Sequence, residues 1–275
     1  MLYNVALEQR RTWWGRGQGK GATYYQQKAE LPDLKAAYPE FGAIHAHVLQ
    51  DVILRLDRAF QAFFRRVKAG ETPGYPRFQG RGRYTSFTFP EYGNGAVLDG
   101  RVLSLSKIGR IRIRLHRPLE GTPKTVTISR EADGWYACIS CADVPVQPLP
   151  ATSQEAGVDL GIEAFDTISD GMRMFSPSWY RKAERALKTA QRRVSRRKRG
   201  SNRRRKAIVL LAKAHLKVKR QRQDVQHKTA LHLVRQYDSV YFEDLQTANM
   251  VRNHSLAKSI SDVGWAAFLK GSMRR

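Results

Sequence analysis

Hydrophobic residues recur at intervals of three and four between residues 43 and 68, which predicts one long amphipathic helix. The apolar stripe consists of Ile44, Val48, Val52, Leu56, Ala59, Phe60, Phe63 and Phe64. Because the aromatic residues share this stripe, we expect them to pack in a core, and base stacking is the alternative. Residues 1–7 have the pattern of a helix interior, and residues 15–21 that of a loop.

Short runs of alternating polar and apolar residues fill positions 84–143 and predict a β-rich region. Between residues 110 and 115, arginines alternate with isoleucines and a leucine, which gives this strand one apolar and one cationic face. A small β-barrel or a curled sheet fits the spacing. The expected strands are residues 85–89, 96–98, 102–105, 108–115, 124–128 and 136–141.

The only two cysteines, Cys138 and Cys141, lie in the last of these strands with a CxxC spacing. Residues three apart on a strand point to opposite faces, and no second CxxC is present to complete four zinc ligands. We therefore expect two ordinary strand cysteines and no zinc site.

Two segments rich in proline and glycine, residues 68–78 and 144–150, divide the chain. They predict a helical region at residues 1–75, a β-rich region at residues 76–150, and a third region at residues 151–275.

The third region is expected to begin with a strand at residues 156–162. A second strand follows and ends in the Asp170-Gly171 turn signal, and residues 172–175 form a third strand. Ser176 and Pro177 are typical of a helix start, with serine as the cap and proline at the first position.

A helical hairpin should follow, because residues 200–202 interrupt a long basic run. The apolar run at residues 237–242 then predicts a strand that is parallel to the first strand of this region, since a helix connects the two. Residues 254–270 have the pattern of one final helix.

With 49 Lys and Arg residues against 24 Asp and Glu residues, the chain has a formal net charge of +25. This excess favours a polyanionic partner, of which nucleic acid is the leading one. An anionic membrane surface is the alternative, but no apolar run reaches the about 18 residues that a membrane-spanning helix needs. Residues 1–20 lack the apolar core of a signal peptide, so we expect a cytoplasmic protein.

Two basic segments are the candidate nucleic-acid-binding surfaces. The first interleaves cations with flat rings, a composition suited to phosphates and unstacked bases, and a solvated loop is the alternative. The second is the predicted helical hairpin, whose uniform positive sign would make its helices repel each other without a polyanion. The candidate residues are Arg77, Phe78, Arg81 and Arg83 in the first segment, and Arg192, Arg193, Arg196, Arg197, Lys198, Arg199, Arg203, Arg204, Arg205 and Lys206 in the second.

Asp159 and Glu243 are the candidate catalytic and metal-binding residues. Asp159 is placed in the middle of an apolar strand, where burial of an unpaired acid would be costly, and the alternative is an ordinary hairpin whose aspartate faces solvent. Glu243 ends the parallel strand, so it should lie beside Asp159. Asp244 is its rival, but neighbouring strand residues face opposite ways. Carboxylate oxygens suit Mg²⁺, and nucleases of the RNase H type hydrolyse phosphodiesters with two such ions.

Several segments carry a family resemblance. Gly157–Ile162 with Ser169–Gly171 resembles the first RuvC motif of the TnpB (OrfB) proteins of insertion sequences, and Tyr241–Leu245 is similar to their second RuvC motif. These proteins are transposon-encoded, RNA-guided DNA endonucleases related to the type V CRISPR effectors. Further similar segments are residues 49–68, 75–78, 224–228 and 256–262, the last followed by Trp265 and Phe268.

The resemblance implies a fold as well as an activity. A helical recognition-like segment and a wedge-like β-barrel would precede an α/β RuvC domain with the RNase H fold at residues 151–275. Guide RNA and target DNA would be the partners, and Mg²⁺ or Mn²⁺ the cofactor, held by Asp159 and Glu243. Such a protein would be cytoplasmic and associated with the nucleoid when bound to DNA.

The chain also departs from that pattern. In the family, a four-cysteine zinc ribbon and a third catalytic aspartate follow the helix that ends near Lys270, and a strand and a helix precede the segment similar to residues 1–10. We therefore expect a shortened, catalytically impaired protein with an incomplete RuvC domain. The alternatives are a nuclease-deficient RNA- or DNA-binding remnant, a transposition accessory protein, and a ribosome-associated basic protein, against which the ordered acid-bearing strands argue.

Overall fold

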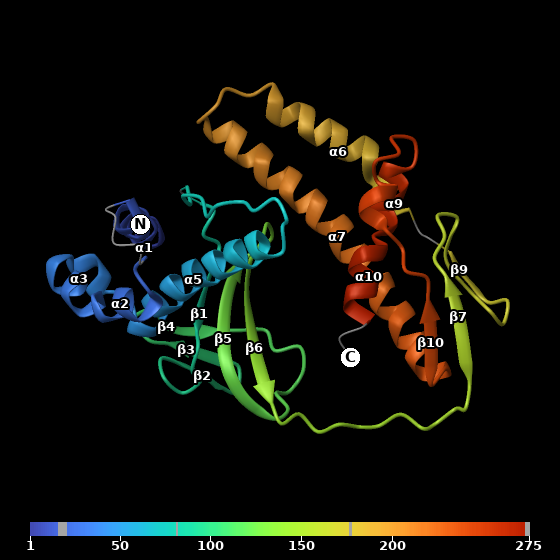
Figure 1. Cartoon of the computed structure of the whole chain (residues 1–275), viewed down its shortest axis with the longest axis horizontal. Helices are drawn as coiled ribbons and strands as arrows, with labels where there is room; N and C mark the ends of the chain where they lie inside the picture. The colour runs from blue at the N-terminus through green and yellow to red at the C-terminus, as the bar shows by residue number, and fades with distance from the viewer. Residues whose placement is uncertain (16–20, 81, 176–177, 273–275) are drawn as a thin grey trace. The chain divides into compact units, whose positions relative to one another are not determined.

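The computed structural model of the chain describes residues 1–15, 21–80, 82–175 and 178–272. The chain forms two compact units, unit 1 (Met1–Val146) and unit 2 (Gln147–Arg275) (Figure 1). The prediction of a further boundary after residue 75 stays a prediction. Among the described residues, no helix is both long and apolar enough to cross a membrane.

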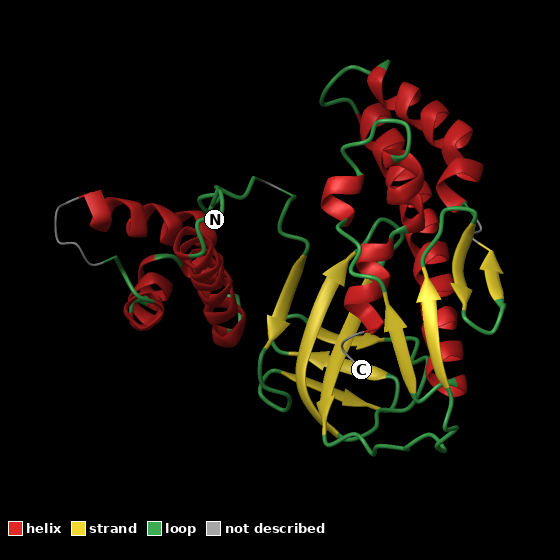
Figure 2. Cartoon of the chain, turned by 45° about the vertical axis from the view of Figure 1, so that its right-hand side comes forward, coloured by secondary structure: helices red, strands yellow, loops and turns green. Residues whose placement is uncertain are grey.

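The helices of the described part of unit 1 are α1 (Leu2–Gly15), α2 (Tyr24–Ala29), α3 (Leu31–Ala37), α4 (Pro39–Gly42) and α5 (Ala46–Lys68). They lie on one side of the strands of this unit (Figure 2). Helix α5 confirms the predicted amphipathic helix, and its Leu56 and Phe60 are buried against Leu7 of α1. Ile44 and Phe64, which the sequence pattern placed in the same stripe, are exposed.

An arginine inside unit 1 joins helix to sheet. Arg55 of α5 donates hydrogen bonds to the Ser86 carbonyl oxygen (2.9 Å) and the Thr88 hydroxyl (2.9 Å). Its Nε also lies 2.7 Å from a carboxylate oxygen of Asp51, one turn earlier. This cation therefore serves the fold, and the count of 49 Lys and Arg residues overstates the number of cations that are free to meet a partner.

The strands of unit 1 are β1 (Ser86–Phe89), β2 (Ala96–Asp99), β3 (Val102–Leu105), β4 (Gly109–Arg112), β5 (Thr122–Arg130) and β6 (Trp135–Ala142). They form two antiparallel sheets, β1-β5-β6 and β2-β3-β4, which share a core that includes Phe89, Leu103 and Val126. The pairing of the described strands leaves both sheets open, so a closed barrel is not shown. Cys138 and Cys141 are free thiols on β6, as expected for ordinary strand cysteines.

Unit 2 contains a mixed sheet with the order β10-β7-β8-β9. The strands are β7 (Glu155–Asp159), β8 (Ala164–Ile168), β9 (Arg173–Phe175) and β10 (Ser239–Phe242). Strands β7, β8 and β9 are antiparallel neighbours, whereas β10 pairs parallel to β7. The parallel pairing confirms the expectation from the connecting helices.

The helical hairpin that precedes β10 consists of α6 (Trp179–Ser195) and α7 (Asn202–Gln236) (Figure 1). Ser201 caps α7, since its hydroxyl accepts a hydrogen bond from the Arg204 amide. The predicted start of the first helix at Ser176 and Pro177 lies outside the described residues. In the described part, α6 begins at Trp179, and Ser178 provides no side-chain cap.

The last described segment holds α8 (Thr247–Met250), α9 (Ala257–Val263) and α10 (Trp265–Ser272). The prediction of one helix over residues 254–270 is therefore wrong. Gly264 separates α9 from α10 with a left-handed φ of +74°, and a Cβ atom there would lie 3.1 Å from Gln226 Nε2. A glycine in this conformation is a common helix end, because it lacks a side chain that would clash.

The core of unit 2 lies on one face of the mixed sheet. It joins β7 and β8 to α7, α9 and α10 through Ala156, Val158, Leu160, Phe165, Ile168, Leu233, Tyr237, Ile260, Val263, Trp265 and Phe268. The opposite face of the sheet, called the open face below, carries the exposed residues of the same strands.

Candidate active site

Strand alternation decides which side chains reach the open face. On β7, Ala156 and Val158 are buried, whereas Glu155, Gly157 and Asp159 are exposed. Asp159 is the last residue of β7 and not its centre, and its side chain faces away from the core. Of the two alternatives for Asp159, the aspartate that faces solvent is the one that the structure shows, because the apolar residues around it belong to the other face.

Glu243 follows β10 directly and is exposed. In the parallel register Phe242 pairs with Val158, so Glu243 and Asp159 occupy the next two adjacent positions. Both acids thus lie where two neighbouring parallel strands end. Asp244 is also exposed, but its carboxylate accepts a hydrogen bond from Gln246 (3.3 Å).

The row that contains the two acids continues across the sheet. Asp159 pairs with Thr167 of β8, and Thr167 pairs with Arg173 of β9. Paired residues on neighbouring strands point to the same face. Glu243, Asp159, Thr167 and Arg173, called the acid–arginine row below, therefore cross the open face from one edge strand to the other.

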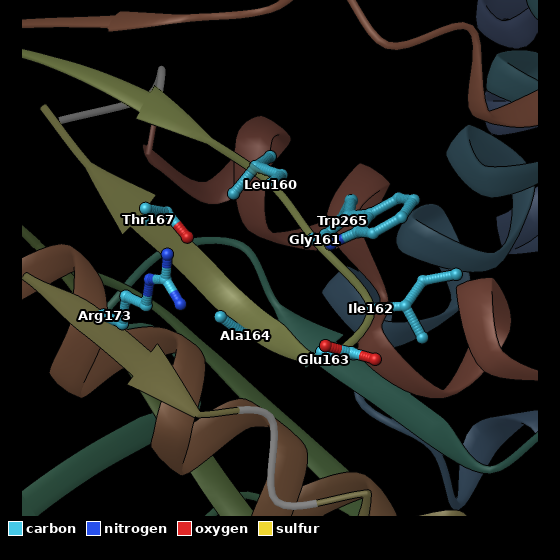
Figure 3. A pocket seen from close by; sticks show the side chains of 8 residues that line it. All are labelled: Leu160, Gly161, Ile162, Glu163, Ala164, Thr167, Arg173 and Trp265. Atoms are coloured by element: carbon cyan, nitrogen blue, oxygen red, sulfur yellow. The ribbon is translucent and has the colours of Figure 1, made fainter. Parts of the chain in front are cut away.

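A pocket adjoins this row at the turn between β7 and β8 (Figure 3). Its volume is about 460 Å³, and its lining is Leu160, Gly161, Ile162, Glu163, Ala164, Thr167, Arg173 and Trp265. Figure 3 shows the Thr167 hydroxyl beside the Arg173 guanidinium, with the Glu163 carboxylate at the other end. Gly161 is required by the tight turn, because a Cβ atom there would lie 2.9 Å from the Ala164 carbonyl oxygen.

The donor chemistry of the two acids fits a divalent cation. Exposed carboxylate oxygens are hard ligands, and Mg²⁺ commonly uses one or two of them while keeping several waters. Within the described residues, no group of three or more His, Cys, Asp or Glu side chains is placed to hold a metal ion. Asp159 and Glu243 are therefore two adjacent candidate ligands, and the part of the chain that the structure describes adds no third.

The β7–β8 hairpin also contains a buried acid, Asp166, which the sequence analysis did not single out. Asp166 of β8 has an exposed fraction of 0%, and neither carboxylate oxygen has a hydrogen bond of standard geometry. Burial raises the pKa of Asp166 above its ordinary value of 3.8, and the Met174 amide and His232 only partly oppose this. Alternation with Ile168 explains the burial, since both residues face the core.

The acid that anchors the basic hairpin was also missed. Asp262 of α9 accepts hydrogen bonds from the backbone amides of Tyr180 (2.9 Å) and Arg181 (3.2 Å), the first-turn donors of α6. Asp262 therefore provides the N-terminal cap of α6, which the side chain of Ser178 does not provide. A partner more than 80 residues away in the chain gives no local sequence signal.

The candidate cations of the hairpin divide into two groups. Arg204 donates to the carbonyl oxygens of Val194 (3.0 Å) and Arg197 (3.1 Å), so it closes the turn between α6 and α7. Arg197 and Arg204 are partly buried. The remaining candidates are exposed, namely Arg192, Arg193, Arg196, Lys198, Arg199, Arg203, Arg205 and Lys206.

The aromatic basic segment belongs to unit 1. Arg77, Phe78 and Arg83 are exposed, whereas Arg81 lies outside the described residues. The Arg11 guanidinium lies 5.6 Å from the centroid of the Phe78 ring, so one face of this ring already meets a cation.

Comparisons with known proteins agree with one another. A family model, OrfB_IS605, described as "Probable transposase", matches residues 137–254. A protein of Streptomyces pristinaespiralis, described as "Putative RNA-guided DNA endonuclease", is 34% identical over 273 residues, which are 96% of this chain and 65% of that protein. "Putative RNA-guided DNA endonuclease InsQ" of Escherichia coli (strain K12) is 29% identical over 229 residues, 82% of this chain and 54% of that protein.

The chain thus spans between about half and two thirds of the length of these two relatives. Among solved structures, it aligns with a chain of a CRISPR-Cas12f ternary complex at 13% identity and a TM-score of 0.30, covering 98% of this chain and 67% of that one. A TM-score this low does not establish a common fold.

Proposed function

Because the chain belongs to the TnpB/OrfB family of insertion-sequence proteins, we propose that it is an RNA-guided, metal-dependent DNA endonuclease with an RNase H-like RuvC domain in unit 2. One observation carries this proposal. Asp159 and Glu243 occupy adjacent register positions at the ends of two parallel strands, and both are exposed.

Each acid has a distinct structural support for the proposed role. Asp159 ends a strand whose buried side is fixed by Ala156 and Val158, so its carboxylate is held on the open face. Glu243 follows Phe242, which packs against the same core. The two carboxylates would hold a divalent cation, which would activate water and stabilise the leaving oxygen of a phosphodiester. Mg²⁺ is the proposed ion and Mn²⁺ the substitute.

The exposed cations near the hairpin turn are proposed to bind the phosphate backbone of the guide RNA and its heteroduplex with DNA. Arg203 and its exposed neighbours present donors that backbone recognition can use without reading sequence. Arg77, Phe78 and Arg83 are proposed as a further contact for unpaired nucleotides.

The test begins with the full chain, purified together with the RNA that it retains. That RNA is sequenced, and a duplex DNA that matches it is incubated with the complex in Mg²⁺. We expect cleavage that Asp159→Asn and Glu243→Gln abolish. Glu155→Gln is the matched control, because Glu155 is an exposed acid on the same face of β7 outside the acid–arginine row.

A second candidate function is RNA or DNA binding without cleavage. It is favoured by the two-ligand donor set, since the described residues offer no third side chain for the metal. Salt-dependent binding with no Mg²⁺-dependent cleavage would support this function and contradict the nuclease. Absence of both binding and cleavage would contradict the two functions together.

A further inference from the structure

The acid–arginine row contains a cation that the proposed metal chemistry does not use. Arg173 is exposed at the start of β9, and within the described residues it makes no ion pair or side-chain hydrogen bond. It lies two strands from Asp159 in the same row, and neighbouring strands are about 4.8 Å apart. Its backbone therefore lies about 10 Å from that of Asp159, and no ion pair joins the two side chains among the described residues.

The pocket beside this row gathers hydrogen-bond donors from two strands. Thr167 of β8 contributes a hydroxyl and Arg173 of β9 a guanidinium, and Figure 3 shows these two groups beside each other. Trp265 of α10 also lines the pocket, but it is 2% exposed and belongs to the core of unit 2. A hydrogen-bond acceptor placed at the Thr167 hydroxyl and the Arg173 guanidinium would be stabilised by both donors.

The charge of the pocket selects the class of acceptor. Arg173 brings a permanent positive charge, whereas Glu163 places one carboxylate at the opposite end of the pocket (Figure 3). An anion near Arg173 and Thr167 would also lie next to Asp159 in the row. Two neighbouring acids repel a nucleic-acid strand, so a cationic contact beside them would hold the strand there.

We propose that Thr167, Arg173 and the pocket at the β7–β8 turn form a subsite for one backbone phosphate of the DNA strand to be cut, beside the scissile phosphate. This inference rests on the proposed function for the identity of the strand. Arg173 and Thr167 are positioning residues, which orient the strand, while Asp159 and Glu243 face the reacting phosphate.

The experiment measures binding separately from cleavage. The full chain with its retained RNA is titrated with the matching single-stranded DNA in Ca²⁺, across a series of salt concentrations. A second series of the same DNA carries a neutral methylphosphonate at one backbone position at a time. The proteins are the wild type, Arg173→Gln, Thr167→Val and the control Arg235→Gln.

Arg235 is a suitable control because it is an exposed arginine in the last turn of α7. This turn leads into the start of β10, whereas the acid–arginine row crosses the sheet at the end of β10. We expect Arg173→Gln to weaken binding about fivefold, as for one exposed charged contact. The slope of the logarithm of its binding constant against the logarithm of the salt concentration should become shallower by about 0.7, the value for one lost phosphate contact on a single strand. Thr167→Val should weaken binding less, and Arg235→Gln should not change its dependence on the methylphosphonate position.

The decisive readout is whether the effect of a methylphosphonate on binding depends on the presence of Arg173. In the wild type, one methylphosphonate near the cleavage position should weaken binding, and the same substitution should have no effect in Arg173→Gln. Equal sensitivity of both proteins at every position would overturn the inference. Unchanged thermal stability of Arg173→Gln shows that the comparison uses folded protein.

Cleavage in Mg²⁺ is measured on the same preparations and reports on the proposed function alone. Coupling without cleavage would support a phosphate subsite for the bound DNA strand and contradict the nuclease. Cleavage that depends on Asp159 but shows no coupling to Arg173 would support the nuclease and overturn the subsite.

Discussion

The Asp262 carboxylate lies 3.2 Å from the Arg222 guanidinium and joins α9 to α7. The same carboxylate caps α6 through two backbone amides, so one buried acid holds three helices of unit 2 together. Its side chain is 4% exposed, which makes each of these contacts hard to replace with water.

Asp262→Ala should therefore be strongly destabilising. It removes a helix cap and leaves the Arg222 charge partly buried without its partner, which together predict a loss of about 3 kcal/mol in the free energy of unfolding. Urea unfolding measures this change. Asp224→Ala is the control, because the Asp224–Lys228 pair is exposed and should contribute less than about 0.5 kcal/mol. Similar losses for both variants would contradict the anchoring role.

Arg203 and Arg204 are neighbours in sequence with separate roles. Arg204→Ala removes two hydrogen bonds that close the hairpin turn, so it should lower stability by about 1–2 kcal/mol. Arg203→Ala should leave stability unchanged and weaken RNA binding with a smaller salt dependence, because Arg203 is exposed. Thermal unfolding and salt-dependent RNA titration of both variants give the comparison. The reverse assignment of effects would refute it.

Asp166 should make the folded state less stable as pH rises. Burial raises its pKa above 3.8, so the folded chain holds this proton more tightly than the unfolded chain does. Stability is then lost from pH 3.8 upward, through the raised folded pKa. Asp166→Asn should be about 1 kcal/mol more stable than the wild type at pH 7, with a difference that disappears below pH 3.8. Urea unfolding from pH 3 to pH 8 tests this, with the exposed Asp99→Asn as control.

Glu184 should have the opposite pH dependence. Contacts with Lys188 and Lys258 lower the pKa of Glu184 from 4.5 to about 2, so its interactions stabilise the folded chain above pH 4.5. This contribution should be lost as pH falls through about 2. The difference in melting temperature between wild type and Glu184→Gln is therefore constant from neutral pH to about pH 5 and shrinks in stronger acid. A difference that grew on acidification would contradict this linkage.

Local sequence patterns predicted helices, strands and turns well where residues close in the sequence determine the structure. The spacing of apolar residues predicted α5, and the interruption at residues 200–202 predicted the turn between α6 and α7. The apolar run before Glu243 predicted a strand parallel to β7. In each case the signal lies within the element or at its ends.

The errors arose where distant parts of the chain decide the outcome. Whether Asp159 or Asp166 is buried depends on which face of the sheet the helices cover, and both acids lie in apolar surroundings in the sequence. The break at Gly264 depends on its contact with Gln226 of α7 as well as on glycine itself. The position of Arg173 in line with Asp159 follows from strand register, which the sequence does not specify.

The distance along the chain between α6 and its cap also affects synthesis on the ribosome. The Tyr180 amide and the Asp262 carboxylate are separated by 82 residues. At about 5–20 residues per second, translation of that interval takes roughly 4–16 s. The hairpin itself ends at Gln236, so for the last 26 residues of this interval, roughly 1–5 s, a complete hairpin lacks the cap of its first helix. The order of synthesis thus leaves α6 without its final stabilising contact until α9 has been made.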